Sequence, residues 1–143
     1  MNIVGQNIVV FDAEIKNVID GTLIKWTDHA KMKISTVCLF DFRTMDYMVY
    51  LDDNMPELVD RLNDAQLVVG FNIHGFDIPL LKACIEGKTH EYKTYDLLDE
   101  YRAAFGGNKF SKGCKLDNVL EATFGAQHMK TDHGSEAPIM YQR

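Results

Sequence analysis

The chain has 143 residues, of which 46% are hydrophobic and 25% are charged, and its formal net charge is −6. This length and composition predict a single globular domain over residues 1–143, and the absence of a long apolar run or a basic secretory leader predicts a cytoplasmic protein. The negative charge disfavours a protein that holds nucleic acid by a broad basic surface, but it is compatible with an enzyme whose acidic residues hold cations that bind phosphates.

The first third of the chain predicts three strands. Residues 8–11 (IVVF) form a short apolar run rich in β-branched residues, which is typical of a strand buried on both faces in the middle of a sheet. Residues 34–42 and 47–51 are two further β-rich runs, and the polar stretch 43–46 between them suits a hairpin turn. We expect this hairpin to form an antiparallel arm beside the first strand.

The rest of the chain alternates helices and strands. Pro56 marks a helix start, and residues 66–71 return to the character of a buried strand. Further helices are predicted at 76–85, 96–104 and 117–124, whereas 126–143 shows no clear period. This order predicts an α/β fold with a mixed sheet, in which three early strands are antiparallel, later strands are parallel, and helices lie on both faces.

Asp12 and Glu14 follow the first apolar strand at a spacing of two, so both carboxylates project to the same side of an extended chain. Two negative charges ~4 Å apart repel by about 4 kcal/mol at an effective dielectric of ~20, and a cation between them would relieve this repulsion. Mg²⁺ and Mn²⁺ prefer such oxygen ligands. Two solvated residues at a strand end are the common alternative for so short a motif.

A further acidic residue lies where a later strand gives way to a helix. In residues 68–77 (VVGFNIHGFD), Asn72 ends a buried strand and Asp77 opens a helix, whose dipole stabilises a carboxylate there. Each residue has a structural alternative, since Asn is a turn former and Asp is common in the first turn of a helix. The presence of both acidic segments in one chain favours a shared metal site.

These segments resemble the DEDD-type (DnaQ-like) 3′-5′ exonucleases of the ribonuclease-H-like superfamily, and within them a group of predicted exonucleases of bacteria and phages. The similar residues are 11–14 (FDAE), 70–72 (GFN), 76–77 (FD), 94–98 (TYDLL), 115–119 (KLDNV), 124–125, Lys130 and 134–138 (GSEAP). The resemblance implies a ribonuclease-H-like fold and hydrolysis of phosphodiester bonds at the 3′ ends of single-stranded DNA or RNA.

The same resemblance implies roles for individual residues. The catalytic groups are Asp12, Glu14 and Asp77. The same three residues are expected to hold two Mg²⁺ or Mn²⁺ ions about 3.5 to 4 Å apart. The substrate-binding residues are Asn72, Phe76 and Lys130. The Phe76 ring is expected to stack on a base, and Asp96 is expected to cap a helix and support the site rather than to bind metal.

One departure concerns the third motif of this family, a Tyr or His followed by a last Asp on a helix near the C-terminus. No such pair precedes Arg143. Asp132 and His133 lie in the right region, but they come before residues 134–138 and in the reverse order. We therefore expect a domain cut short at its C-terminus or one that has lost the last ligand. Little exonuclease activity is expected from residues 1–143 alone unless Asp132 replaces that ligand. A catalytically impaired module that binds nucleic acid or a protein partner and a hydrolase of another phosphoester remain alternatives.

Overall fold

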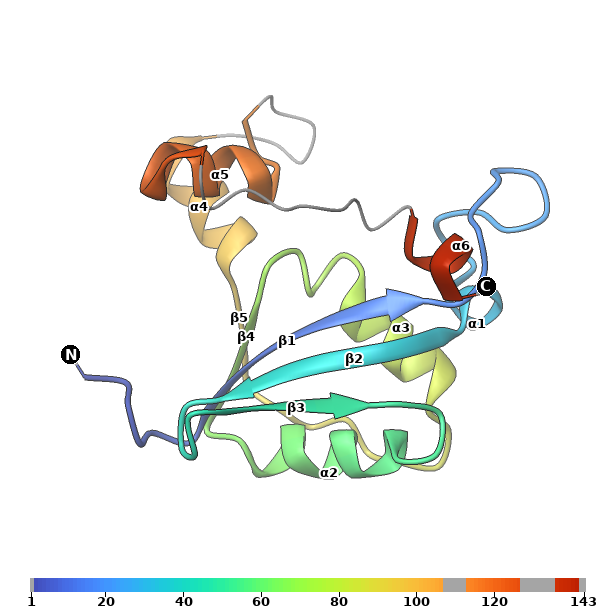
Figure 1. Cartoon of the computed structure of the whole chain (residues 1–143), viewed down its shortest axis with the longest axis horizontal. Helices are drawn as coiled ribbons and strands as arrows, with labels where there is room; N and C mark the ends of the chain where they lie inside the picture. Colours follow the sequence, from blue (N-terminus) through green and yellow to red (C-terminus); the bar gives the residue numbers. More distant parts are fainter. Residues whose placement is uncertain (1, 107–112, 127–135, 142–143) are drawn as a thin grey trace.

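The computed structural model describes residues 2–106, 113–126 and 136–141, which are arranged around a five-stranded sheet of order β3-β2-β1-β4-β5 (Figure 1). The strands are β1 (Ile8–Ile15), β2 (Ile34–Asp41), β3 (Asp46–Tyr50), β4 (Leu67–Gly70) and β5 (Thr94–Asp96). β2 pairs antiparallel with β1 and β3, and β4 pairs parallel with β1 and β5. The predicted mixed sheet, with its early antiparallel hairpin and later parallel strands, is confirmed.

The helices of the described residues are α1 (His29–Met32), α2 (Met55–Asp64), α3 (Asp77–Cys84), α4 (Leu97–Phe105), α5 (Leu116–Phe124) and α6 (Ala137–Tyr141). α2 lies below the strands in Figure 1, and α4 to α6 lie above them. The sequence predicts α2 to α5 and misses α1 and α6, which are only four and five residues long. Among the described residues, no helix has the length and apolar character needed to cross a membrane.

β1 is the central strand, as predicted, but its burial is one-sided rather than two-sided. Its buried residues are Val9, Phe11, Ala13 and Ile15, and they belong to one core cluster with residues of α2 and α3. On the other face Val10 is half-buried, Asp12 is exposed and Glu14 is half-buried. Asp12 is therefore exposed to solvent on this face, and α6 also lies against β1.

The pairing of β1 with β4 is short. The parallel register joins Ile8 with Leu67 and ends with Val10 opposite Val69. After Gly70 the chain leaves the sheet and turns toward α3. The edge of β1 beyond Val10 consequently faces the loop that leads into this helix, and not a continuing strand.

Candidate active site

A tight loop between β4 and α3 delivers Asp77 to this edge. Asn72 has a φ of 62°, in the left-handed region that few residues other than Gly and Asn adopt. A Cβ on Gly75 would lie 2.5 Å from the Asn72 Oδ1, and a Cβ on Gly70 would lie 2.2 Å from the Cγ2 of the buried Ile73. Both glycines are therefore needed for the close approach of neighbouring side chains. Residues 70–77, part of the segment that resembles the exonucleases, therefore also contain residues that this loop needs in order to fold.

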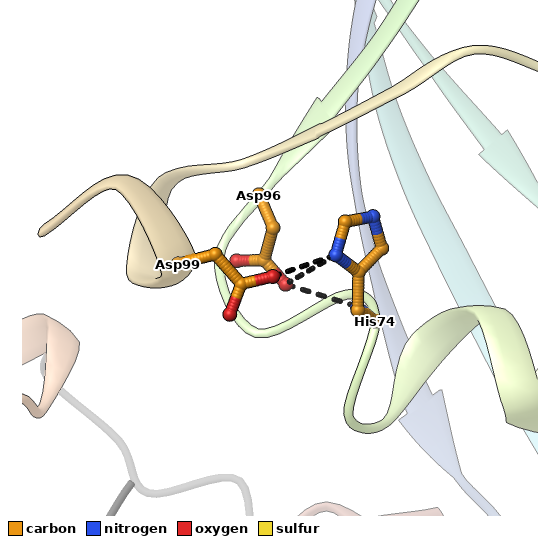
Figure 2. A group of neighbouring side chains, drawn as sticks. All are labelled: His74, Asp96 and Asp99. Atoms are coloured by element: carbon orange, nitrogen blue, oxygen red, sulfur yellow. Dashed lines mark hydrogen bonds and ion pairs between the residues drawn. The ribbon is translucent and has the colours of Figure 1, made fainter. Parts of the chain in front are cut away.

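Asp96 holds the loop from the neighbouring strand (Figure 2). Its side chain is buried at the end of β5. Its Oδ1 accepts hydrogen bonds from the backbone N–H groups of Asn72, at 2.7 Å, and Leu98, at 3.0 Å. Its Oδ2 accepts one from the N–H of His74, at 2.9 Å. The bond from Leu98 is the predicted helix cap, and the other two fix the β4–α3 loop to the start of α4.

His74, Asp96 and Asp99 form a cluster whose potential ligand atoms all lie within 4.8 Å of one another, a spacing that a metal site requires (Figure 2). Both ring nitrogens of His74 are already engaged. Nδ1 lies 2.7 Å from the Asp99 Oδ2, and Nε2 lies 2.8 Å from the Thr94 Oγ1. Because Asp96 also accepts three backbone hydrogen bonds, we interpret this cluster as a clamp on the loop, which the sequence did not predict.

Asp77 contacts the part of β1 that carries the other two acidic residues. Its carboxylate is buried, and its Oδ1 accepts a hydrogen bond of 3.0 Å from the N–H of Ala13. Ala13 stands between Asp12 and Glu14. The bond also satisfies a backbone N–H on the edge of β1 that the short pairing with β4 leaves open.

The Asp77 carboxyl does not ionise as readily as an ordinary aspartate. Burial, and after it the negative charge of Asp12, raises the pKa of Asp77 to about 7, with a smaller contribution from Asp96, although the hydrogen bonds from the backbone oppose this shift. Repulsion between carboxylates was expected from the sequence, but burial is the larger cause. Asp12 and Asp96 thus both lie within electrostatic reach of Asp77.

The structure brings Asp77 to β1, but it does not gather the three predicted ligands as tightly as the His74 cluster. Within residues 2–106, 113–126 and 136–141, that cluster is the one group of three His, Cys, Asp or Glu residues with ligand atoms within 4.8 Å. Glu14 follows Asp12 on the same face of β1, opposite Thr36 of β2.

The predicted substrate-binding residues lie in different surroundings. Asn72 forms the left-handed turn described above, and Lys130, like Asp132, lies outside the described residues. The Phe76 ring is half-buried, packs against the core and has its centroid 6.0 Å from that of Trp26. The exposed Trp26 beside the candidate site was not singled out from the sequence, because no motif contains it.

A surface pocket of about 480 Å³ lies elsewhere, near the ends of α2 and α3. Its lining includes Lys16, Lys33, Asp52, Cys84 and Glu86, and none of the predicted ligands is part of it. The carboxylates of the candidate site therefore lie outside this pocket, with Asp12 exposed, Glu14 half-buried and Asp77 buried.

A family model described as the RNase_H superfamily matches residues 26–143. The chain belongs to the RNase_H superfamily. The superfamily match begins after β1, so Asp12 and Glu14 precede the matched residues. Comparison with curated protein sequences gives no match.

Among solved structures, this RNase_H superfamily chain is similar to the family B DNA polymerase from the hyperthermophilic archaeon Pyrobaculum calidifontis, with a TM-score of 0.66 and 16% sequence identity. The similarity covers 95% of this chain and 21% of the polymerase, so the chain spans about a fifth of that protein's length. At this identity the likeness concerns the fold, and the predicted ribonuclease-H-like fold is confirmed.

Proposed function

We propose that the chain is a metal-dependent 3′-5′ exonuclease domain of the DEDD (DnaQ-like) type, acting on the 3′ ends of single-stranded DNA or RNA. Membership of the RNase_H superfamily supports a nuclease-type function. The observation that carries the finer proposal is the bond from the Ala13 N–H to Asp77, which seats a buried carboxylate between Asp12 and Glu14 on the central strand.

The residues present fit Mg²⁺ or Mn²⁺, because both ions prefer carboxylate oxygens. The raised pKa of Asp77 supports this fit, since a divalent cation would offset both the burial of the carboxylate and its repulsion from Asp12. Asp12, Glu14 and Asp77 would hold the ions. When bound, such ions activate a water molecule and stabilise the leaving 3′ oxygen of a phosphodiester.

The other residues of the site position the ligands and the substrate and take no part in the chemical step. Asp96 fixes the loop that carries Asn72 and thereby the start of α3, where Asp77 stands. In this proposal Asn72, Phe76 and Lys130 bind the terminal nucleotide of the strand. Asp12 is exposed on β1, so a strand end can reach it without passage through a closed cavity.

The test combines metal binding with digestion. Mn²⁺ binding is measured by isothermal titration calorimetry, and 5′-labelled single-stranded DNA and RNA are incubated with excess protein in Mn²⁺, in Mg²⁺ or in chelator. The variants are Asp77→Asn and, as a matched control, Asp53→Asn, which changes an exposed carboxylate in the turn before α2. We expect Mn²⁺ to bind to the wild type and the control and much more weakly to Asp77→Asn.

Trimming from the 3′ end is expected to require metal and Asp77. It should be slow, because the three proposed carboxylate ligands, Asp12, Glu14 and Asp77, would have to hold two ions between them. Equal Mn²⁺ binding by the wild type and Asp77→Asn, or trimming that survives in chelator, would overturn the proposal. Binding of metal and strand without any trimming would favour the catalytically impaired module over the exonuclease.

A further inference from the structure

We propose that Trp26, supported by Phe76, is a stacking surface for one of the last two bases of a nucleic-acid strand whose 3′ end is bound at the carboxylate site. The proposal rests on the proposed function and adds a residue that neither the motifs nor the comparisons assign. It also changes the part played by Phe76, which becomes the support of the stacking residue as well as a neighbour of the terminal nucleotide.

Trp26 is the sole tryptophan of the chain, and 69% of it is exposed. A tryptophan side chain can bury a large apolar area, so leaving it in water forgoes a substantial stabilisation. Its ring contacts that of Phe76, with centroids 6.0 Å apart and an interplanar angle of 64°. Such an edge contact orients the indole and leaves most of its surface open.

Phe76 offers less open surface than Trp26. Its ring is half-buried against the core and also contacts His29, with centroids 6.3 Å apart. Phe76 immediately precedes Asp77, so the support of Trp26 is one residue from a proposed metal ligand. The more open aromatic side chain at this end of the site is consequently Trp26, which lies on a different loop.

The turn that carries Trp26 is closed by its own hydrogen bonds. The Asp28 Oδ2 accepts one from the Lys25 N–H at 3.1 Å, and the Asp28 N–H donates one to the Lys25 carbonyl at 2.9 Å. Earlier in the loop, the Asp20 Oδ1 accepts three, from the N–H groups of Thr22, Leu23 and Ile24. Trp26 therefore stands at the second position of a fixed turn, and a stacking contact would lose little conformational entropy.

An exposed aromatic residue by itself is common on protein surfaces. Trp26 differs because its turn is closed and its ring contacts the residue next to Asp77. Stacking tolerates any base, which suits an enzyme that acts on strand ends of varied sequence. The exposed Lys25 beside it adds a positive charge that a phosphate can approach.

The test measures strand binding in Ca²⁺. A 5′-fluorescein-labelled oligothymidylate reports binding by its anisotropy, and an unlabelled one is expected to quench the fluorescence of the sole tryptophan. Trp26→Ala should weaken binding roughly 5- to 150-fold, as loss of one base stack does, and Trp26→Phe should recover most of the affinity. Phe105→Ala serves as the control, because Phe105 is 75% exposed at the end of α4, on the opposite side of the molecule (Figure 1).

A second perturbation separates stacking from a general loss of structure. Strands of the same length that lack the last or the next-to-last 3′ base are bound by the wild type and by Trp26→Ala. If Trp26 stacks on a missing base, its substitution has no further effect on that strand, so the two changes are not additive. Fully additive losses on both strands would overturn the proposal.

The failures of the two proposals are distinguishable. If the wild type binds the strand and Mn²⁺ through Asp77, but Trp26→Ala binds the strand equally well and the tryptophan emission is unchanged, the stacking proposal is wrong and the proposed function stands. If the wild type binds neither the strand nor Mn²⁺, the proposed function itself is wrong.

Discussion

Replacement of Asp77 by Asn is expected to stabilise the metal-free protein at neutral and alkaline pH. The folded state raises the pKa of this carboxyl from 3.8 to about 7 through burial and the charge of Asp12, so it binds the proton more tightly than the unfolded chain does. The contribution of this carboxyl to wild-type stability is then greatest below pH 4, falls as the pH rises toward 7 and is level above that. An amide at position 77 does not titrate, and it can still accept the hydrogen bond from the Ala13 N–H.

The size of the effect follows from the shift. A pKa that moves from 3.8 to about 7 corresponds to about 4 kcal/mol between the two ends of this pH range. An Asn side chain accepts hydrogen bonds less strongly than a carboxylate does, which offsets part of this gain. We therefore expect the substitution to raise the free energy of unfolding by about 2 to 4 kcal/mol at pH 8 and by nearly nothing at pH 4. Domains of this kind have a total stability of roughly 5 to 15 kcal/mol, so the difference is easily measured.

The assay is urea unfolding in chelator at several pH values between 4 and 8, followed by circular dichroism, for the wild type, Asp77→Asn and the control Asp53→Asn. Addition of Mn²⁺ at pH 8 should raise the free energy of unfolding of the wild type by about 2.7 kcal/mol at a hundred times its dissociation constant, and that of Asp77→Asn much less. A difference between wild type and Asp77→Asn that does not change with pH would refute the reasoning, and so would a less stable Asp77→Asn at pH 8.

Two further substitutions test the supports of the site, and a third tests the buried ion pair that joins α2 to the end of β2. Gly70→Ala places a Cβ 2.2 Å from the Ile73 Cγ2, and we expect urea unfolding to show a loss of about 1 to 3 kcal/mol, together with weaker Mn²⁺ binding because the loop before Asp77 must move. Asp96→Asn removes a charged acceptor of three backbone N–H groups and should lower the free energy of unfolding by about 1 to 3 kcal/mol, whereas an unchanged value would contradict its role as a clamp. Arg61→Met leaves the buried Asp41 without the guanidinium that donates to it at 2.9 Å, so thermal unfolding should reveal a loss of about 3 to 5 kcal/mol.

The sequence predicts the elements that have a strong local signal. The apolar runs give β1 to β4, whereas β5, with only three residues, has no such run. Pro56, Asp96 and Gly106 stand at helix ends, Gly106 with the positive φ of 67° that favours glycine there. α1 and α6 are missed because four or five residues are too few to show a helical period. The one-sided burial of β1 is missed because an unbroken apolar run has the same pattern whether one face or both are covered.

The approach of Asp77 to Asp12 was predictable, because Asp77 follows β4 and the carboxyl ends of neighbouring parallel strands meet at one edge. Asp12 was expected just after its strand, but β1 continues past it to Ile15. The clamp on the loop was not predictable. The bonds from Asn72 and His74 to Asp96 join residues 24 and 22 positions apart, and no local pattern signals them. The approach of Trp26 to Phe76 is hidden for the same reason, since it depends on how two loops fold over the sheet.

The central place of β1 also determines the order in which the domain can be assembled. β1, β2 and β3 are consecutive and antiparallel, so they can pair soon after they leave the ribosome, whereas the other edge of β1 must wait for β4. Until then that edge is exposed to pairing with other chains, a hazard for a nascent protein. Asp77 reaches the Ala13 N–H only after this parallel pairing has brought the following loop into place. The pairing of β4 with β1 and the formation of the carboxylate site are therefore one folding step. A chain that stops folding before this pairing contains the acidic residues, but they do not form a site.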